Sequence, residues 1–305
     1  MQLQAWNRIH PIIRGYDGTF LTHHPITSAK MPPKTVLITG CSDGGIGAAL
    51  AAEFQAQGCQ VFATARNVNK MESLSKLGVH TLELDVNSDA SIAAAVAIVK
   101  KETGGRLDIL INNAGINYVM PFLDSKIEEH RRVIETNVIA VLAVTHAFLP
   151  LLIEAKGTVA SVGSINEFFT PPFQVTYNAS KAAIHAIARS LRAELAPLGV
   201  KFVTLITGAV TTKLFDNAPT ELPEGSLYQP VKQKIEKREF LEGGRFIEAE
   251  KYAKQVVGDL LKPTPKLNIW RGGMVTVAWI LSLFGWEGLL DASMIKEFEL
   301  YKVHQ

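Results

Sequence analysis

The sequence predicts an α/β protein in which helices cover both faces of a parallel sheet. Short runs of β-branched and other apolar residues alternate with longer segments whose apolar residues recur at helical spacing. Strands that read as almost continuous apolar runs between helices are typical of a parallel sheet buried on both faces. The chain has no internal repeat and no low-complexity linker. We therefore expect one doubly wound domain.

The expected elements follow one another along residues 35–208. The first strand, 35–40, reads TVLITG and leads through glycines into a helix over 46–57. Ser88 is placed to cap a helix over 88–102, because a serine before a helix can accept a backbone N–H. The other strands are expected at 60–66, 80–86, 107–112, 157–164 and 200–208. The other helices are expected at 126–154 and 177–195.

The composition is that of a globular protein and excludes several classes. Of the 305 residues, 47% are hydrophobic and 20% are charged, unlike a disordered chain. The net charge of +2 gives no general case for nucleic-acid binding. Two cysteines, Cys41 and Cys59, cannot form a disulfide framework and fit a reducing compartment. No cluster of histidines, cysteines and acids has a zinc-binding spacing, so no metal is expected.

The N-terminal end is expected to lie outside this domain. Residues 1–33 have no hydrophobic period and no uninterrupted apolar run of the kind that a secretory signal needs. We expect a disordered extension there, and a start of translation at Met31 is the alternative interpretation. A cytoplasmic location is expected.

Residues 263–305 form an expected apolar C-terminal extension. They contain a 13-residue uncharged run, MVTVAWILSLFGW over 274–286, shorter than the ~20 residues that span a bilayer. Three interpretations are open: a core helix, a cover over an apolar substrate, or a helix that rests on a membrane surface. Core packing or a substrate cover is the simpler interpretation. A membrane contact would place the protein peripherally on the endoplasmic reticulum or on lipid droplets.

A glycine-rich turn follows the first strand, where ligands of such sheets bind. It reads TGCSDGGIG over 39–47. Glycines allow a sharp turn and a close approach of the backbone, and the helix that follows presents free N–H groups to a phosphate. The turn alone is weak evidence, because a purely structural turn is also rich in glycine. The residues expected to line a nucleotide are Gly40, Ser42, Gly45, Ile46 and Gly47.

The end of the second strand indicates which cofactor is bound. NAD enzymes usually place an acid there for the ribose 2′-hydroxyl, whereas an arginine accommodates the 2′-phosphate of NADP. This strand ends in Ala65-Arg66-Asn67, without an acid. A guanidinium binds phosphate through forked hydrogen bonds and stays charged. The sequence favours NADPH over NADH, although a solvated arginine at a strand end is common.

Three residues could carry the chemistry. Tyr177 and Lys181 are four residues apart on an expected helix and therefore share a face. An ammonium beside a phenol favours phenolate and lowers the pKa of the phenol, which is ordinarily about 10. Ser164, at the end of the preceding strand, could donate a hydrogen bond to a carbonyl oxygen. Ser161 is a rival on the same strand.

Together these features resemble the short-chain dehydrogenase/reductase family over residues 34–262. The step of 13 residues from Ser164 to Tyr177 matches the family and decides against Ser161. The resemblance implies a Rossmann-type fold and an oxidoreductase that acts on hydroxyl and carbonyl groups with NADP. It rests on the glycine-rich turn, Asn112-Asn113-Ala114-Gly115, Asn137, Ser164 and Tyr177-x-x-x-Lys181.

The resemblance also implies a role for each residue. Tyr177 would donate a proton in reduction, and Lys181 would lower its pKa and hold the nicotinamide ribose. Ser164 would orient the carbonyl, and Asn137 would hold a water of the proton relay. Residues 212–247 would form the substrate lid. The other cofactor contacts implied are Asp85 at the adenine amino group, Asn113 at the adenosine ribose, and Val210 and Thr212 at the nicotinamide end.

Two departures from the family's pattern leave individual cofactor contacts open. The turn carries one extra residue before Gly45-Ile46-Gly47. After the sixth strand, Thr207-Gly208 stands where the family usually has Pro-Gly.

A narrower resemblance concerns the substrate. The segments 40–47, 61–66, 222–226 and 270–273 are similar to those of fungal NADPH-dependent 1-acyldihydroxyacetone-phosphate reductases. That resemblance implies reduction of a ketone on an acylated glycerolipid precursor to lysophosphatidate. Reductases of fungal polyketide and terpenoid pathways belong to the same group and are the alternative; steroid- and retinol-type relatives are more distant options.

A non-catalytic NADP-binding sensor is a further alternative, since a fold does not fix a function. The chain keeps both Tyr177 and Lys181, which favours an enzyme. The partners expected are an apolar or acylated ketone and, as a homo-oligomer, a second copy of the chain.

Overall fold

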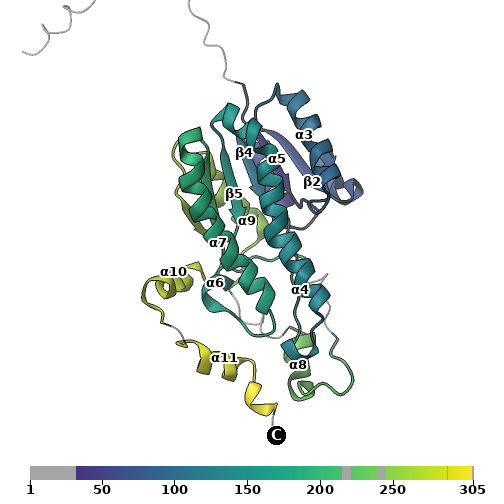
Figure 1. The fold of residues 1–305 in the computed structure, drawn as a ribbon, viewed down its shortest axis with the longest axis vertical. Helices are drawn as coiled ribbons and strands as arrows, with labels where there is room; N and C mark the ends of the chain where they lie inside the picture. Colours follow the sequence, from purple (N-terminus) through teal and green to yellow (C-terminus); the bar gives the residue numbers. More distant parts are fainter. Residues whose placement is uncertain (1–31, 215–220, 239–244, 287, 304–305) are drawn as a thin grey trace, which may run out of the picture. The chain divides into compact units, whose positions relative to one another are not determined.

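The computed structural model describes residues 32–214, 221–238, 245–286 and 288–303 (Figure 1). One parallel sheet of seven strands runs through this part of the chain, in the order β3-β2-β1-β4-β5-β6-β7. The chain winds outward from β1 in both directions, which confirms the doubly wound fold. The expected N-terminal disorder over 1–33 falls almost entirely outside the described residues.

The six expected strands are all present, and a seventh follows them. Their bounds are β1 Thr35–Thr39, β2 Gln60–Ala65, β3 His80–Glu83, β4 Ile109–Asn112, β5 Thr158–Val162, β6 Lys201–Thr207 and β7 Asn268–Arg271.

The helices connect these strands and continue beyond them. Ser88 caps α3 as expected, accepting the N–H of Ser91 at 3.3 Å. The bounds are α1 Ile46–Ala56, α2 Glu72–Lys76, α3 Asp89–Thr103, α4 Ile127–Ile134, α5 Ala140–Ala155, α6 Asn166–Phe169, α7 Val175–Leu195, α8 Lys232–Glu236, α9 Ala249–Leu260, α10 Val275–Phe284 and α11 Asp291–Glu297.

Two apolar clusters lie on the two faces of the sheet. Successive strand residues point to opposite faces, so Val36 and Ile38 join one cluster and Leu37 joins the other. Helices α1 and α9 cover the first face. Helices α3, α5 and α7 cover the second and lie side by side in Figure 1. This two-sided burial explains why the strands are almost continuously apolar.

Strand β7 lies in the segment that was expected to be a separate extension. It pairs in parallel with β6, with Asn268 beside Thr204 and Arg271 beside Thr207. The expected domain boundary after residue 262 is therefore wrong, because the sheet continues to Arg271. Asn268 and Arg271 leave only Ile269 and Trp270 as apolar residues of the strand, too few to show the pattern of a buried strand.

A pair of backbone segments meets closely beyond the ends of β6 and β7. The N–H of Gly208 donates to the Arg271 carbonyl at 2.8 Å, and Ala209 and Gly273 exchange two backbone hydrogen bonds at 2.9 Å. A Cβ on Gly208 would lie only 2.0 Å from the Gly273 oxygen. The close packing explains why glycine stands at position 208, and a Cβ on Gly273 would in turn meet the Arg245 carbonyl oxygen at 1.5 Å.

The single helix expected over 126–154 is interrupted by a π-helical turn. This turn, Glu135–Ile139, joins α4 to α5 and contains the buried Asn137. A π turn adds one residue to the helical turn and is frequent at functional sites. The insertion barely changes the apolar period, so sequence patterning could not reveal it.

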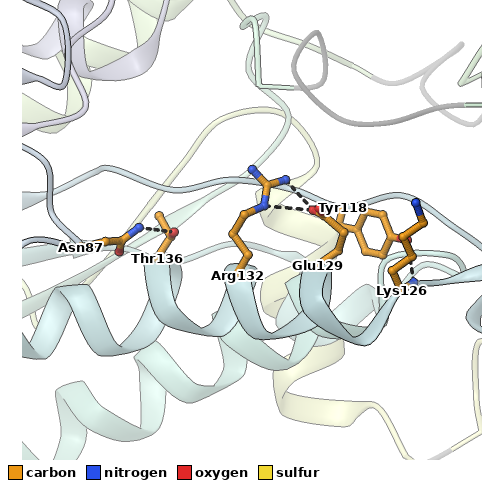
Figure 2. A network of polar contacts seen from close by, with 6 residues as sticks. All are labelled: Asn87, Tyr118, Lys126, Glu129, Arg132 and Thr136. Atoms are coloured by element: carbon orange, nitrogen blue, oxygen red, sulfur yellow. Dashed lines mark hydrogen bonds and ion pairs between the residues drawn. The ribbon is translucent and has the colours of Figure 1, made fainter.

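Several polar contacts tie α4 and the π turn to neighbouring loops (Figure 2). The N–H of Lys126 donates to the Tyr118 hydroxyl at 3.1 Å, just before α4. Asn87, which follows β3, donates to the Thr136 hydroxyl at 3.0 Å. These contacts hold the helix that carries Asn137 at the carboxyl edge of the sheet.

Residues Ile127–Ala155 form the one helical stretch, among those described, that is long and apolar enough to cross a membrane. Its inner side packs in the second core cluster through Val144, Phe148 and Leu152, all almost fully buried. The stretch is therefore a core helix of this domain.

Helix α10 is exposed, which makes the core-helix interpretation of residues 274–286 wrong. Trp279 is 48% exposed, Phe284 73% and Trp286 69%, and Ala278 is the only buried residue of the helix. Sequence composition could not reveal this, because a buried helix and an exposed apolar helix share the same residues.

A candidate active site at the carboxyl edge of the sheet

The glycine-rich turn lies directly after β1, at the carboxyl edge of the sheet. Gly40 has a φ of +73°, a left-handed conformation that glycine adopts without strain. A Cβ there would lie 2.8 Å from Cα of Ala114, and a Cβ on Gly47 would lie 2.5 Å from the Gly40 carbonyl oxygen. Glycine is thus required at both positions, and the turn packs against the strand end of β4.

The start of α1 has the properties of a phosphate-binding helix terminus. Gly45 caps the helix without any side-chain hydrogen bond, and the first turn has no acidic residue. The backbone N–H groups near Ile46 are therefore free, and the helix dipole favours an anion there. These features fit a dinucleotide pyrophosphate.

Asn113 holds the turn in place. Its amide Nδ2 donates to the carbonyl oxygens of Thr39 at 2.8 Å and of Gly40 at 2.9 Å. The hydroxyl of Thr39 in turn accepts the backbone N–H groups of Asn113 and Ala114, both at 3.0 Å. Asn113 thus has a structural role in this chain; its contact with an adenosine ribose stays a prediction.

Arg66 and Asp85 follow β2 and β3 at the same edge of the sheet. Arg66 is exposed and forms no ion pair with any residue of the described segments. Its guanidinium is available to a phosphate. Asp85 is half-buried, and its Oδ1 accepts the N–H of Asn87 at 3.0 Å, which fixes the carboxylate in a turn.

The structure brings Ser164, Tyr177 and Lys181 together. Ser164 follows β5 and lies beside the Tyr177 phenol, whose pKa it lowers; its hydroxyl donates to Asn166 Oδ1 at 3.4 Å. Lys181 donates from Nζ to the carbonyl oxygen of Val162 at 2.8 Å, and its Nζ lies 5.5 Å from the centre of the Tyr177 ring. All three side chains are buried. The sequence prediction that they share one site is consistent with this geometry.

Ser161 points elsewhere. Its hydroxyl accepts from Asn112 Nδ2 at 3.4 Å, inside the sheet, and the residue is almost fully buried. The geometry thus agrees with the choice of Ser164 over Ser161.

Burial dominates the charge states of the site. It raises the pKa of Tyr177 to about 12, against a smaller lowering by the hydrogen bond from Ser164. Burial also lowers the pKa of Lys181 to about 8. The net shift of the Tyr177 pKa is thus upward, and a lowering contribution from Lys181 stays a prediction. Removing water disfavours phenolate and ammonium alike, and it outweighs their attraction.

Asn137 braces two segments that line the site. Its side chain accepts the N–H of Ile116 and donates to the carbonyl oxygen of the same residue, both at 2.9 Å. It also donates to the Ser180 hydroxyl at 3.1 Å, and Ser180 donates to the Tyr177 carbonyl oxygen at 2.7 Å. Asn137 is thus connected to the first turn of α7; its contact with a relay water stays a prediction.

The residues that follow β6 border the site; two of them were predicted, and one was missed. Val210 is buried and Thr212 is half-buried. Lys213 was not predicted; its Cε lies 2.9 Å from the position of a Cβ on Gly44, which has a φ of +81°. A cation against the phosphate-binding turn is well placed for an anion. Lys213 belongs to none of the motifs that carry the family resemblance, so the sequence gave no signal for it.

Asn166 and Asn178 were also missed. The N–H of Asn166 donates to the Ser164 hydroxyl at 3.1 Å, and its Nδ2 donates to the Asn178 side chain at 3.0 Å. Asn178 directly follows Tyr177, so the two asparagines connect the segment after Ser164 with the first turn of α7. No local pattern pointed to them, because the link joins two segments through side chains.

Among the described residues, no group of three or more histidines, cysteines and acids could hold a metal. Cys41 is fully buried, and burial raises the pKa of its thiol to about 12.

Comparison with known proteins shows the family of this chain. The sequence profile of the short chain dehydrogenases matches residues 34–222. A short-chain dehydrogenase/reductase of Pestalotiopsis microspora, GME11361, is 41% identical over 288 residues, which cover 92% of this chain and 98% of the relative. An NADPH-dependent 1-acyldihydroxyacetone phosphate reductase of Schizosaccharomyces pombe is 40% identical over 266 residues, covering 82% of this chain and 89% of the relative. The chain belongs to the short-chain dehydrogenase/reductase family.

Solved structures show the same architecture. A short-chain dehydrogenase from Streptomyces avermitilis superposes with a TM-score of 0.73 at 26% identity, over 89% of this chain and 98% of that one. An alcohol dehydrogenase from Thermococcus sibiricus, complexed with 5-hydroxy-NADP, superposes with a TM-score of 0.64 at 25% identity, over 79% and 97%.

The low pKa of Lys181 predicts a pH-dependent stability. Above about pH 8 the folded protein has lost this proton, whereas the unfolded chain keeps it up to a pKa of about 10.5. The contribution of Lys181 to the free energy of unfolding therefore rises between these pH values and is lost as the pH falls through 8. We expect the stability of Lys181→Met relative to wild type to fall by about 1 kcal/mol per pH unit in this window. Urea denaturation of both proteins at several pH values measures this difference in the free energy of unfolding. A difference that does not change with pH would contradict the lowered pKa of Lys181.

Proposed function

We propose that this chain is an NADPH-dependent carbonyl reductase in which Tyr177 donates a proton to a ketone. The observation that carries the proposal is the buried group of Ser164, Tyr177 and Lys181 beside the glycine-rich turn. The family is that of oxidoreductases acting on alcohol and carbonyl groups, and the Schizosaccharomyces pombe relative is named as NADPH-dependent.

The residues present fit NADP(H). The glycine turn and the start of α1 would hold the pyrophosphate, and Arg66 would hold the 2′-phosphate. Lys213, against Gly44, adds a further positive charge at the turn. Asp85, Asn113, Val210 and Thr212 keep their proposed contacts with the adenine, the ribose and the nicotinamide end. The cofactor, when bound, supplies the hydride of the reduction.

Tyr177 is suited to donate a proton to the carbonyl oxygen. With a pKa of about 12 the phenol is protonated at neutral pH, so the acid is present before reaction. Ser164 stabilises the developing negative charge on the carbonyl oxygen by donating a hydrogen bond. The Lys181 ammonium, charged below about pH 8, stabilises the phenolate left behind. Asn137 positions the first turn of α7 and, in this proposal, a water that returns the proton.

The proposed substrate is 1-acyldihydroxyacetone phosphate, whose ketone would be reduced to give lysophosphatidate. The support is the 40% identity with the Schizosaccharomyces pombe reductase. A ketone of a fungal polyketide or terpenoid pathway is the alternative. Identity does not choose between the two, because relatives from Talaromyces islandicus and Penicillium crustosum are 42% and 41% identical and their names, short-chain dehydrogenases, state no substrate.

The experiment that separates these substrates is a screen of NADPH consumption. Purified protein is incubated with acyl-dihydroxyacetone phosphate and with a panel of apolar polycyclic ketones, while the absorbance of NADPH is followed. The proposal expects turnover of the acylated phosphate at the highest kcat/KM. Faster turnover of an uncharged polycyclic ketone supports the alternative, and binding of NADPH without any turnover supports a sensor.

Replacing Tyr177 by phenylalanine should abolish turnover and leave NADPH binding intact. The change removes the proton donor but keeps the ring, so kcat should fall about 10²- to 10⁴-fold. Turnover and fluorescence titration of NADPH measure the two effects. Tyr252→Phe is the matched control, because it also removes a buried hydroxyl, one that bonds Thr207 at 2.7 Å outside this group. Near-normal turnover of Tyr177→Phe would show that another group is the acid.

Arg66→Ala should weaken NADPH much more than NADH. A charge-assisted contact with a phosphate that is made equally in ground and transition states acts on KM, by about 10- to 100-fold. The control is Lys76→Ala, an exposed cation paired with Glu72. Steady-state kinetics with both cofactors give the ratio, and an equal loss for NADPH and NADH would refute the assignment of the 2′-phosphate.

We further propose that α10 rests on a lipid surface, which would place the protein peripherally on a membrane or lipid droplet. Its outward side carries Val277, Trp279, Ile280, Leu283 and Phe284, all exposed. The hydroxyl of Ser282 donates to the Trp279 carbonyl at 2.6 Å and so needs no water. A helix of this length, about 15 Å, can lie in one interface but cannot span a bilayer.

Two basic residues near this helix contribute little to a lipid contact. Lys262 and Arg271 both pair with Asp259, each at 2.6 Å, so much of their charge is neutralised. Insertion of aromatic side chains, rather than attraction to anionic headgroups, therefore carries the proposed contact.

Flotation with vesicles of phosphatidylcholine and phosphatidylserine tests the lipid contact. Wild type should float, and Trp279→Ala/Trp286→Ala should stay in the dense fraction with an unchanged melting temperature. The matched control is Phe122→Ala/Leu123→Ala, which removes two apolar side chains of similar exposure elsewhere. If wild type does not float and the tryptophan variant instead changes the sedimenting mass, α10 is an interface between copies of the chain.

A further inference from the structure

The segment between Ser164 and Tyr177 contains an unusual backbone conformation. Phe173 has a φ of +68°, in the left-handed region where the backbone of a residue other than glycine is strained. Gln174 follows as the cap of α7, and Tyr177 is the third residue of that helix. The direction of the first turn of α7, and with it the position of the Tyr177 phenol, therefore depends on the backbone of Phe173.

Three contacts hold Phe173 in this conformation. Its carbonyl oxygen accepts the N–H of Met120 at 2.8 Å. Its ring meets Tyr228, from the segment before α8, edge to face with centroids 5.7 Å apart. It also meets Phe298, just after α11, with centroids 5.6 Å apart and an interplanar angle of 68°. Such ring pairs add to the free energy gained by burial, which can offset the strain.

Phe298 is itself firmly placed. It is 3% exposed, although most of α11 before it lies on the surface. Val303, further along the tail, packs on the apolar cluster that includes Tyr118, Val231 and Ile235. Glu299 forms a hydrogen bond with Lys302 and is attracted by Lys234 of α8, and both lower its pKa. The tail thus lies against the α8 segment and Phe173 together.

We propose that Phe298 is a positioning residue for the reaction: by packing on Phe173 it maintains the left-handed turn that starts α7 and so fixes Tyr177. The proposal rests on the proposed role of Tyr177 as proton donor. It gives the C-terminal segment a function in catalysis, although that segment lies more than a hundred residues from Tyr177 in the sequence. Phe298 acts through Phe173.

A purely structural role of Phe298 predicts a different result. If Phe298 only adds apolar burial, its loss should lower stability throughout the domain and leave kcat of the folded protein unchanged. If it positions α7, its loss should loosen the start of that helix in particular. The hydrogen bond from the Asn178 N–H to the Gln174 carbonyl, 2.9 Å long, closes the first turn and reports this loosening.

Hydrogen exchange of the full-length protein, read by mass spectrometry over residues 174–181, is the primary test. In Phe298→Ala we expect exchange there to become about 10-fold faster, with unchanged exchange in β1 and β4. We also expect kcat toward acyl-dihydroxyacetone phosphate to fall about 10-fold, with unchanged KM for NADPH. Phe298→Leu, which keeps the apolar volume, should restore most of both. Ile295→Ala, exposed on α11, should behave as wild type.

A double-mutant cycle identifies the route through Phe173. Glycine adopts positive φ without strain, so Phe173→Gly should keep the turn without help from Phe298. In that background, Phe298→Ala should cause less than about a 2-fold further change in exchange and kcat. A further 10-fold loss, or wild-type exchange and kcat in Phe298→Ala alone, would overturn the proposal.

Failure of the proposed function is distinguishable from failure of this inference. If wild type reduces no ketone, the proposed function fails, and the exchange measurements alone decide on Phe298. If Phe298→Ala does not fold, the comparison of Phe173→Gly with Phe173→Ala decides. The alanine variant should lose protection over 174–181 and the glycine variant should keep it, and equal protection in both would overturn the proposal.

Discussion

The hydrogen bond from Lys181 to the carbonyl oxygen of Val162 joins helix α7 to the end of strand β5, and the site depends on it. Val162 is the last residue of β5, and Ser164 lies two residues beyond it. Anchoring Lys181 there brings Tyr177, one helical turn earlier, to the Ser164 hydroxyl. The register of β5 against β4 and β6 in turn fixes where the strand ends. A displacement of either strand would separate the groups.

Burial of Tyr177 and Lys181 shifts their pKa values in directions that suit a reductase. It raises the pKa of the phenol to about 12 and lowers that of the lysine to about 8, so at neutral pH the phenol keeps its proton and Lys181 stays mostly charged. A neutral phenol is the form that donates a proton to a carbonyl oxygen. The expectation of a lowered phenol pKa considered the neighbouring charge alone and left out the cost of removing water from both groups. That cost could be known only from the burial of the folded site.

Much of the fold could be predicted from the sequence because the signals were local. The first six strands, the Ser88 cap and the glycine turn each follow from a short run of residues. Strand β7 could not be predicted, because its four residues are stabilised by pairing with β6 and by the meeting of Gly208 with Gly273. The π turn at Asn137 and the contact of Lys213 with Gly44 also depend on packing between distant segments.

The burial of the C-terminal segment also depends on packing and could not be predicted from local sequence signals. An uncharged run of 13 residues did not reveal which side of α10 would be covered. The structure shows that Ala278 is the only buried residue of α10, while Phe298, in a more polar stretch, is buried and packs on Phe173. Apolar composition alone was thus a poor guide to which part of the tail belongs to the site.

We propose that the phenol of Tyr177, buried at the carboxyl edge of the sheet, is the acid of the reaction. The most direct measurement is an NMR titration of protein labelled at tyrosine Cζ, with the Tyr177 signal assigned by its absence from Tyr177→Phe. We expect a pKa of about 12 for Tyr177. A pKa at or below the ordinary value of about 10 would contradict burial as the dominant influence on this phenol.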